Sequence, residues 1–475
     1  MQTVPTTAAS AAEPHTAVRE LERRLPAGQV SVDAADLAAA GLDTWPLLTK
    51  EAMAGEHRHQ PDVVVRATAV DDIRTVLQIA NATATPLTVR ALGSSVTGQP
   101  VPVRGGIVLD VSGLPGGFVV DDVAMTVTAS AAQPGGELED ALIQRGLTLG
   151  HSPQSLYRST VGGWLATLAT GQFSSLYGGI EDLVVGYTVL LATGEEIRLS
   201  ASPRAAMGPD LRQVFLGSEG TLAIITEVTL KVFPVPPVEL VDTVSVPDVA
   251  SGLAALREIA VSGLRPWLIR LYDVDEARHA LRDEDFQTPV VFLGSRGSHR
   301  MAPAEFADLQ EILARHGGRS LGPAGTTAWL GRRYDFSAVE NRLAQSGGFA
   351  ETIEVAHNWP HVQGLYADLK RALAPLADEV LVHFSHLYPQ GTSMYLIVFG
   401  RAADDAAAVT ALQQIWSTAM DIGLAHGAEL SHHHGGGLAR SPYTARSLGS
   451  AHLVLRKIKS ALDPAGVLNP GKLGL

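Results

Sequence analysis

Three consecutive histidines, His432–His434, stand directly before three glycines. Imidazole side chains bind metals and move protons near neutral pH. On a strand, alternation would send His432 and His434 to one face and His433 to the other. A zinc site usually needs more widely spaced ligands and a further Cys, His or carboxylate. The run alone leaves three interpretations open: a metal site, a solvated loop and an active-site loop.

Three single residues also carry side chains suited to chemistry: His151, Arg270 and Tyr395. A lone histidine is usually structural, and Tyr395 lies in an apolar strand pattern where a core tyrosine is the simplest interpretation. Arg270 lies inside an apolar strand, and a buried guanidinium needs an anionic or carbonyl partner. A structural ion pair and a ligand contact would both provide one.

Four glycine-rich segments follow one another in the first half of the chain, at residues 89–98, 150–163, 178–186 and 208–222. In the first, a strand end turns through Gly93, and successive N–H groups in such a turn form a nest for an anion. It is not a Rossmann fingerprint, because no G-x-G-x-x-G opens a helix. Paired glycines let the backbone approach a flat or charged ligand closely. Together the segments suit a planar, anionic ligand.

The elements that must position these residues follow from hydrophobic periodicity. A strand–helix–strand unit opens an α/β region, at residues 62–66, 70–81 and 86–90. Further strands are expected at 107–111, 125–129, 184–191 and 224–232, before a boundary at Pro234–Pro237. Beyond it, strands at 240–246, 267–272, near 289–294, 379–386 and 393–399, with helices at 250–262, 303–316 and 402–425, predict an α+β domain with duplicated halves. A helix and an extended tail are expected in 449–475.

This pattern divides the chain into an N-terminal helical region (1–57), two domains (58–236 and 237–430) and a C-terminal segment (431–475). Within the first region, the small, polar residues up to about Ala12 predict disorder, and 15–41 one or two short helices.

Composition excludes several classes of protein. The net charge of −13 gives no basic stripe for nucleic acid. The absence of cysteine excludes disulfides, thiolate catalysis and Cys-zinc sites. There is no 18-residue apolar run and no secretory signal pattern. We expect a cytoplasmic homodimer that acts on a small molecule and has no membrane span, with peripheral membrane contact left open.

Residues 61–235 resemble the FAD-binding domain of the vanillyl-alcohol oxidase family, the PCMH (p-cresol methylhydroxylase) type. The identifying motifs are Ser159-Thr-Val-Gly-Gly163, Glu181–Val185 and Gly217-Ser-Glu-Gly-Thr-Leu222. Over residues 45–475 the chain is most similar to alkyldihydroxyacetonephosphate synthase, through Gly150–Ser155, Val161–Thr167, Ile269–Asp273, Ser431–Gly435 and Leu462-Asp-Pro464. The resemblance implies an α+β fold: a PCMH-type FAD-binding domain, a ferredoxin-like-repeat substrate (cap) domain and a C-terminal segment that returns to the flavin.

The resemblance also implies a set of FAD-binding residues. These are Arg90, Ala91, Leu92, Gly93, Ser94, Ser95, Gln154, Ser155, Ser159, Thr160, Gly162, Gly163, Thr167, Thr170, Glu219, Gly220, Thr221, Leu222, Ile224 and Ile225. Some relatives bond the flavin to a histidine in the first loop. Here that position is Ser94, and no cysteine is present for the other known link. We therefore expect noncovalent FAD and no metal.

By the same resemblance, Tyr395 falls on the acid/base tyrosine of the synthase and Arg270 on a required arginine. His432, His433 and His434 would lie at the flavin and move protons near its N5 atom, and His151 would lie in a flavin loop. We expect a cation or the flavin beside Tyr395 to lower the pKa of its phenol.

One departure concerns the substrate. The synthase binds a phosphate-bearing substrate with an arginine followed by an aspartate, and these positions are Glu340 and Asn341 here. A carboxylate repels a phosphate dianion. Arg342 would point about 200° away from Glu340 on a helix. We therefore expect a different substrate, either neutral or cationic.

Four hypotheses for the function follow. The first is an FAD-dependent oxidoreductase acting on a C–H bond next to oxygen or nitrogen. The second is redox-neutral synthase chemistry, as in ether-lipid synthesis. The third is a 2-hydroxy-acid dehydrogenase, disfavoured because His-His-His-Gly replaces the Gly-Glu-His-Gly motif of those enzymes. The fourth is a flavin-binding protein without catalysis.

Overall fold

The predicted strand–helix–strand unit opens the first domain of this computed structural model, which describes residues 14–475. The segment up to Ala12 that we expect to be disordered lies outside the described residues. The elements of this part are α1 (Pro14–Arg24), β1 (Val30–Ser31), α2 (Ala34–Ala40), α3 (Pro46–Met53), β2 (Val63–Arg66), α4 (Val70–Thr83), β3 (Leu87–Arg90) and β4 (Ile107–Asp110). β2, β4 and β3 pair in parallel, and β1 adds an antiparallel edge.

A second, antiparallel sheet follows in the order β5-β6-β10-β8-β9. Its strands are β5 (Phe118–Asp121), β6 (Thr126–Ser130), β8 (Val184–Leu191), β9 (Glu196–Leu199) and β10 (Ala223–Lys231). Helices α5 (Gly135–Ile143), α6 (Val161–Thr167), α7 (Ser174–Tyr177) and α8 (Ile180–Leu183) lie beside it, and β7 (Leu147–Thr148) pairs with β11 (Phe233–Pro234). Every residue of β8 is buried, and its sequence is accordingly mostly apolar.

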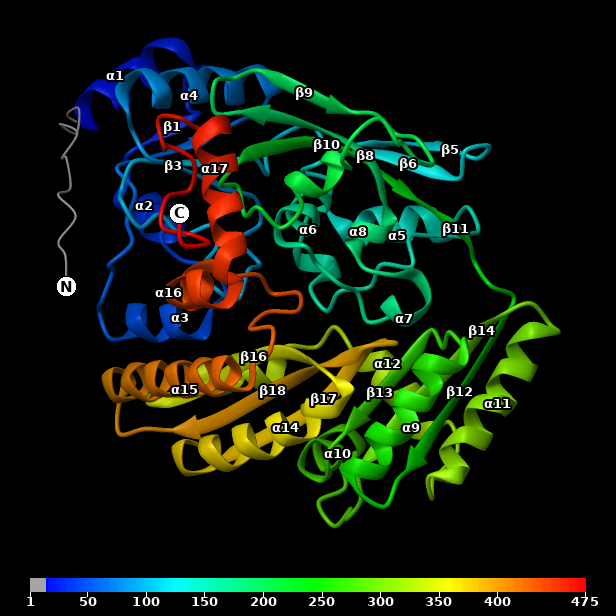
Figure 1. Ribbon diagram of the computed structural model, residues 1–475. Helices are drawn as coiled ribbons and strands as arrows, with labels where there is room; N and C mark the ends of the chain where they lie inside the picture. Colours follow the sequence, from blue (N-terminus) through cyan, green and yellow to red (C-terminus); the bar gives the residue numbers. More distant parts are fainter. Residues whose placement is uncertain (1–13) are drawn as a thin grey trace.

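The cap is a sheet built from two ferredoxin-like halves, as the sequence predicts (Figure 1). Its order is β15-β12-β14-β13-β17-β18-β16. The first half contains β12 (Val238–Ser245), α9 (Val249–Ser262), β13 (Leu268–Tyr272), β14 (Val290–Gly297), α11 (Met301–Arg315) and β15 (Arg319–Ser320). The second contains β16 (Gly348–Asn358), α14 (Trp359–Leu373), β17 (Glu379–Tyr388), β18 (Gly391–Arg401) and α15 (Asp405–His426). An isolated bridge between Ala356 and Glu429 takes the place of the last strand of the second half.

Three helices interrupt this repeat: α10 (Val274–Leu281) between β13 and β14, and α12 (Ala324–Arg332) and α13 (Ser337–Leu343) between the halves.

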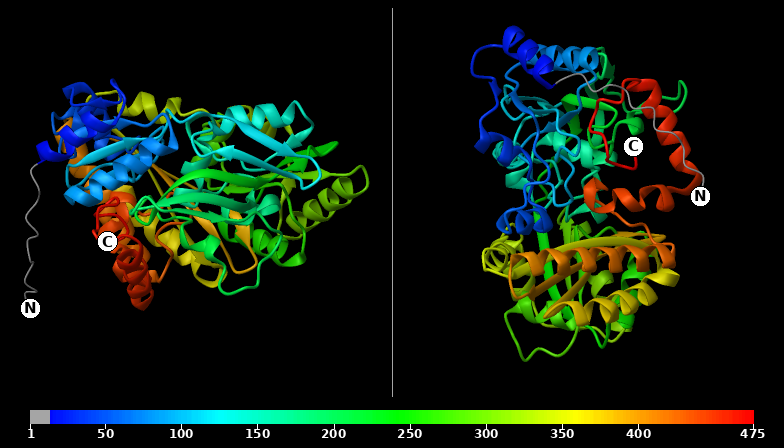
Figure 2. Two further views of the ribbon diagram at one scale, coloured as in Figure 1. Left: turned by 90° about the horizontal axis from the view of Figure 1, so that it is seen from above. Right: turned by 90° about the vertical axis from the view of Figure 1, so that its left-hand side faces the viewer.

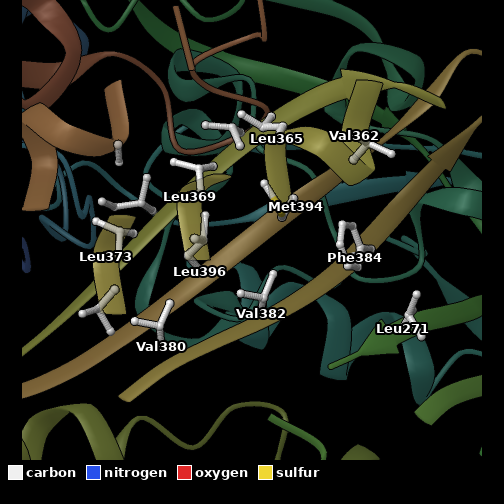
Figure 3. Close-up of a cluster of buried hydrophobic side chains, with 14 of the residues drawn as sticks. Leu271, Val362, Leu365, Leu369, Leu373, Val380, Val382, Phe384, Met394 and Leu396 are labelled. Carbon is white, nitrogen blue, oxygen red and sulfur yellow. The ribbon is translucent and has the colours of Figure 1, made fainter. Parts of the chain in front are cut away.

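Strand alternation gives the cap sheet two different faces. Val380, Val382 and Phe384 of β17, with Met394 and Leu396 of β18, pack against the apolar side of α14 (Figure 3). The residues between them therefore point to the opposite face, toward the first domain.

The C-terminal segment returns to the first domain. It contains α16 (Gly437–Leu448) and α17 (His452–Leu462), which lie at the same end of the molecule as the N-terminal elements (Figure 2). Its tail forms a bridge between Leu468 and Leu87, and Nδ2 of Asn469 donates to the carbonyl oxygens of Gln99 and Glu219. Within residues 14–475, none of the helices combines the length and apolar character that a membrane span requires.

Candidate active site

A cavity of about 960 Å³ lies between the first domain and the open face of the cap sheet. This volume is at the upper end of small-molecule sites, about 300–1,000 Å³. Turns of the first domain and α6 form one side, the N-terminal wall. Strands β13, β16, β17 and β18, with α10, α12 and α13, form the other side, the cap wall.

Most residues that the sequence predicts for FAD binding line the N-terminal wall. They are Arg90, Ala91, Leu92, Gly93, Ser94, Ser95, Gln154, Ser155, Ser159, Thr160, Gly162, Gly163, Thr167, Thr170, Glu219, Gly220, Ile224 and Ile225. Thr221 and Leu222 are fully buried and do not reach the cavity. Segments more than a hundred residues apart in the sequence thus form one surface.

Two glycines of this wall lie where a side chain has no room. A Cβ on Gly162 would lie 2.6 Å from the Cβ of Ala131 and 2.9 Å from its carbonyl oxygen. Gly220 has a φ of +72°, and a Cβ there would lie 2.6 Å from Cγ1 of Val89. At these two positions the wall is therefore bare backbone. Such a surface fits a flat cofactor that main-chain N–H groups approach closely.

Glu219 connects this wall to the C-terminal loop. Its carboxylate accepts the N–H groups of Gly436 (2.5 Å) and Gly437 (2.9 Å) and the side-chain amide of Gln99 (3.0 Å). Burial raises the pKa of Glu219, and these hydrogen bonds oppose the rise. The residue lines the cavity, but its carboxylate holds the glycines that follow the histidine run.

The three histidines lie in a loop and not on a strand. The carboxylate of Glu354 on β16 accepts the N–H groups of His432 (2.5 Å) and His434 (2.9 Å) and the hydroxyl of Ser431 (2.9 Å). Because one carboxylate takes these N–H groups, the loop curls around it instead of pairing as a strand. Burial raises the pKa of Glu354, but Arg440, 3.3 Å away, and the histidines hold it well below its usual range.

This loop places His433 and His434 on the cavity wall and turns His432 away from it. Nε2 of His432 lies 2.8 Å from the hydroxyl of Tyr388. Burial lowers the pKa of His432 and His433 to about 3 and that of His434 to about 4. All of them are therefore neutral at pH 7, and each ring has one nitrogen that donates and one that accepts.

His386, His432 and His433 offer ring nitrogens within 4.8 Å of one another, as a metal site would. Hydrogen bonds already use several of these nitrogens. Nδ1 of His386 lies 2.7 Å from the hydroxyl of Ser174, and Nδ1 of His432 lies 2.9 Å from Nδ1 of His433. The arrangement favours a hydrogen-bonded pair, His432 and His433, with His386 stacked on His432.

Tyr395 stands in a row of cross-strand neighbours on the cavity face of the cap sheet. Strand pairing places Tyr272, His383, Tyr395 and Glu354 side by side on β13, β17, β18 and β16. Both tyrosine rings stack on His383, each with its centroid 4.9 Å from the imidazole centroid. Burial raises the pKa of Tyr395 above its ordinary value, and Arg270 lowers it less. The cation therefore does not lower the pKa of Tyr395 below its ordinary value, and a lowering by the flavin stays a prediction.

The buried guanidinium of Arg270 has a hydrogen-bond partner, and this partner is the ring of His383 instead of a carbonyl or a carboxylate. Its Nη2 lies 2.5 Å from Nε2 of His383, whose Nδ1 lies 2.7 and 2.9 Å from the carboxylate oxygens of Glu276. A guanidinium only donates, so Nε2 accepts and the imidazole proton sits on Nδ1, toward Glu276. Burial, and then Arg270, lower the pKa of His383 well below its usual value. All three residues line the cavity.

His151 does not reach the cavity. Its ring packs against Trp164 with centroids 4.6 Å apart, and among the described residues neither nitrogen has a hydrogen-bond partner. Burial lowers the pKa of His151 to about 3.

Glu340 lies on α13 where the cap wall meets solvent. Its Oε1 is 2.5 Å from Nη1 of Arg158 on the N-terminal wall, and both side chains are about half exposed. The ion pair thus bridges the two walls. Arg342 points away from the cavity toward Asp378 (3.4 Å), as the helical spacing predicts.

Sequence reasoning missed Glu276, His383 and Glu354. For His383 a signal was present, because it is a polar residue between Val382 and Phe384, both of which face the helices. Glu276 gave no such signal. An acidic residue in the first turn of a helix is usually a solvated group near the N-terminus.

Comparisons with known proteins agree with this architecture. Residues 61–200 match the family described as "FAD binding domain", and residues 235–473 match "FAD linked oxidases, C-terminal domain". The FAD-linked oxidoreductase YgcU of Escherichia coli (strain K12) is 32% identical over 87% of this chain and 89% of that protein. Alkyldihydroxyacetonephosphate synthase of Dictyostelium discoideum is 28% identical over 87% of this chain and 74% of that protein.

A solved structure of p-cresol methylhydroxylase with substrate bound shares the fold. Its TM-score is 0.79 at 17% identity, over 99% of this chain and 98% of that one. The PCMH-type fold predicted from the sequence is confirmed, and the cavity lies where the two matched families meet. The chain belongs to the FAD-linked oxidases and is an FAD-dependent oxidoreductase.

Proposed function

We propose that this enzyme oxidises a C–H bond next to oxygen or nitrogen, on a substrate that lacks the phosphate of the synthase substrate. The observation that carries the proposal is the ion pair between Glu340 and Arg158. By resemblance, Glu340 stands where the synthase has the arginine that binds the phosphate of its substrate. A carboxylate there repels a phosphate and also occupies a nearby arginine.

The bound FAD would supply a hydride acceptor. The residues of the N-terminal wall would hold it, with Gly162 and Gly220 allowing close approach of the backbone. Nothing in the chain suggests a covalent link, because Ser94 stands at the linking position of the relatives and cysteine is absent. We therefore propose noncovalent FAD.

The cap wall would bind and orient the substrate. Tyr395, Arg270, His433 and His434 all line the cavity. The phenol of Tyr395 would donate or accept the hydrogen bond of the reacting group, and the neutral histidines would accept its proton. His432, which faces Tyr388 instead, would pass that proton on.

Redox-neutral synthase chemistry is the second candidate. The 28% identity to the Dictyostelium synthase and the presence of Tyr395 and Arg270 in the cavity favour it. The two candidates differ in electron balance. Oxidation leaves the flavin reduced, whereas the synthase reaction returns it oxidised.

An anaerobic experiment separates them. The FAD-loaded enzyme is mixed with a panel of alcohols, amines and 2-hydroxy acids, and flavin absorbance is followed. In parallel it is incubated with acyl-dihydroxyacetone phosphate and a fatty alcohol. We expect loss of oxidised-flavin absorbance with a member of the panel and no ether product. Ether formation that Tyr395→Phe abolishes would overturn the proposal.

A cytoplasmic homodimer remains a prediction of the sequence. Size-exclusion chromatography with light scattering on the FAD-loaded enzyme tests the assembly.

A further inference from the structure

We propose that Glu276, acting through His383, is the counter-ion of Arg270, so that while Glu276 is ionised Arg270 binds an uncharged oxygen of the substrate and not a carboxylate or phosphate. This inference deepens the proposed function, on which it rests, by naming the chemical group that the cap wall recognises. Glu276 and His383 are positioning residues in this account, because they act on the substrate through Arg270.

The geometry fixes the direction of every hydrogen bond in the chain. Arg270 donates to Nε2 of His383 over 2.5 Å, and Nδ1 of His383 donates to Glu276 over 2.7 Å. If both ring nitrogens of His383 carried a proton, Nε2 would be a donor and could not accept from Arg270. The neutral ring therefore links a positive and a negative group, both at least nine-tenths buried.

Arg270 presents its guanidinium to the cavity. Nη2 bonds His383, and Nε is buried without a hydrogen-bond partner among the described residues, so a ligand would meet the terminal nitrogens. The guanidinium lies 5.0 Å from the ring centroid of Trp329 and 5.5 Å from that of Tyr272, which hold its plane. A substrate oxygen that accepts from the part of the guanidinium lining the cavity would be bound favourably, because a buried donor left unpaired is costly.

The charge balance then selects the kind of oxygen. With Glu276 ionised, the net charge of Arg270, His383 and Glu276 is zero. A buried anion added beside them would have no compensating positive charge. A hydroxyl, ether or carbonyl oxygen accepts the same hydrogen bond without that penalty. An anion would enter only together with a proton taken up by Glu276. Arg158 is compensated in the same way by Glu340.

The mouth of the cavity offers a different place for an anion. Arg282, Arg332 and Arg333 line the cavity there, with the carboxylates of Asp335 and Glu340. Arg332 donates to the carbonyl oxygen of Ala280 (2.7 Å), so it is not part of the Arg270 chain. A variant of Arg332 therefore distinguishes binding at the mouth from binding at Arg270.

A pH dependence follows from the geometry. Burial raises the pKa of Glu276 to about 8, and the Arg270 charge opposes that rise. The charged and titratable groups around the chain are Tyr272 and Asp273, His279 on α10, Lys370 and Tyr366 on α14, His386 on β17 and Tyr395 on β18. Below about pH 8 Glu276 gains a proton and loses its charge. Binding of an anion should therefore weaken as the pH rises through that value.

The test measures binding of acetate and of inorganic phosphate to the oxidised, FAD-loaded enzyme, through the change in flavin absorbance. It needs no turnover, so its failure is distinct from failure of the proposed function. In the wild type, affinity for acetate should fall between pH 6.5 and pH 9.5. In Glu276→Gln, affinity at the alkaline end should rise by about tenfold or more and no longer depend on pH.

The surface of the same domain provides a matched control. Glu258 also bonds a histidine and an arginine, His316 (2.7 Å) and Arg315, but all three are solvent-accessible. Glu258→Gln should leave acetate affinity unchanged. His383→Gln should preserve the link, because the glutamine amide can accept from Arg270 and donate to Glu276. His383→Leu breaks the link and should have the same effect as Glu276→Gln. FAD content and the unfolding temperature report whether each variant folds.

Acetate affinity in Glu276→Gln equal to that of the wild type at every pH would overturn the proposal. A pH-independent, tight acetate site in the wild type would do so as well. If Arg332→Gln removes acetate binding in Glu276→Gln, the anion lies at the mouth and the assignment to Arg270 is wrong.

Discussion

The two walls of the cavity are built in different ways. Much of the N-terminal wall is backbone turns and small residues, and its shape depends on glycines such as Gly162 and Gly220. The cap wall presents large polar side chains from its sheet and helices. Within it, Arg270 is compensated by Glu276 through His383, and Glu340 pairs across the cavity with Arg158 of the N-terminal wall. Because the walls are built independently, the N-terminal wall can keep its cofactor-binding shape while side chains of the cap wall change to fit another substrate.

The largest effect is expected from the cap wall. Tyr395→Phe removes the hydroxyl that we place at the reacting group. Anaerobic flavin reduction should slow by about 10²–10⁴-fold, the usual contribution of a positioned acid or base. FAD content should stay as in the wild type, because Tyr395 lies on the opposite wall. Reduction at the wild-type rate would remove Tyr395 from the chemistry.

A second change tests how the histidine loop is held between the walls. Glu354→Gln removes a buried carboxylate that binds the loop and Arg440, and should lower the free energy of unfolding by about 3–5 kcal/mol. Urea unfolding of the FAD-loaded enzyme measures it. Since the folded-state pKa of Glu354 is lowered, its contribution is present above the unfolded pKa and is lost as the pH falls. Wild-type stability should therefore fall on acidification, with a smaller fall in the variant.

If Glu354→Gln unfolds like the wild type, the carboxylate does not hold the loop. The solvent-accessible Glu258→Gln serves as the control and should leave the urea unfolding midpoint nearly unchanged.

The N-terminal wall should respond to size instead of charge. Gly162→Ala puts a Cβ 2.6 Å from that of Ala131, and overpacking of this kind costs about 1–3 kcal/mol. FAD affinity, measured by fluorescence titration, should fall by the corresponding factor. Gly331→Ala is the matched control, because an added Cβ there meets nothing within 4 Å. Equal FAD affinity in both variants would show that the wall has spare room.

The smallest effect on stability is expected at the mouth. Glu340→Gln breaks a half-exposed ion pair, which is worth less than about 1 kcal/mol. It also frees Arg158, so inorganic phosphate should bind the oxidised enzyme a few times more tightly than it binds the wild type. A large loss of stability, or unchanged phosphate binding, would show that the pair has another role.

The sequence predicts the N-terminal wall better than the cap wall, for a physical reason. A turn that receives a cofactor needs glycine and small residues close together in the chain, so Gly93, Gly162 and Gly220 mark it locally. Residues of the cap wall meet only after strands pair. Arg270 and His383 are 113 residues apart.

Local patterns also left the positions of particular residues open. The histidine run His432–His434 was compatible with a metal site, a solvated loop and an active-site loop. In the structure Glu354 binds the backbone N–H groups of a loop, and of the three only His433 and His434 line the cavity. His151 lies in a flavin-loop motif, yet its ring packs behind the wall on Trp164. A neighbouring cation lowers the pKa of a phenol. At Tyr395, however, burial raises the pKa by more than Arg270 lowers it.

The central claim is that the cap wall of this FAD-dependent oxidoreductase accepts an uncharged substrate. The most direct test is the anaerobic rate of flavin reduction at pH 9 with pairs of compounds, each an alcohol or amine and its carboxylate- or phosphate-bearing analogue. The account predicts reduction by the uncharged member of a pair and little or none by its anionic analogue. Reduction only by the anionic member, abolished by Arg270→Gln, would contradict it.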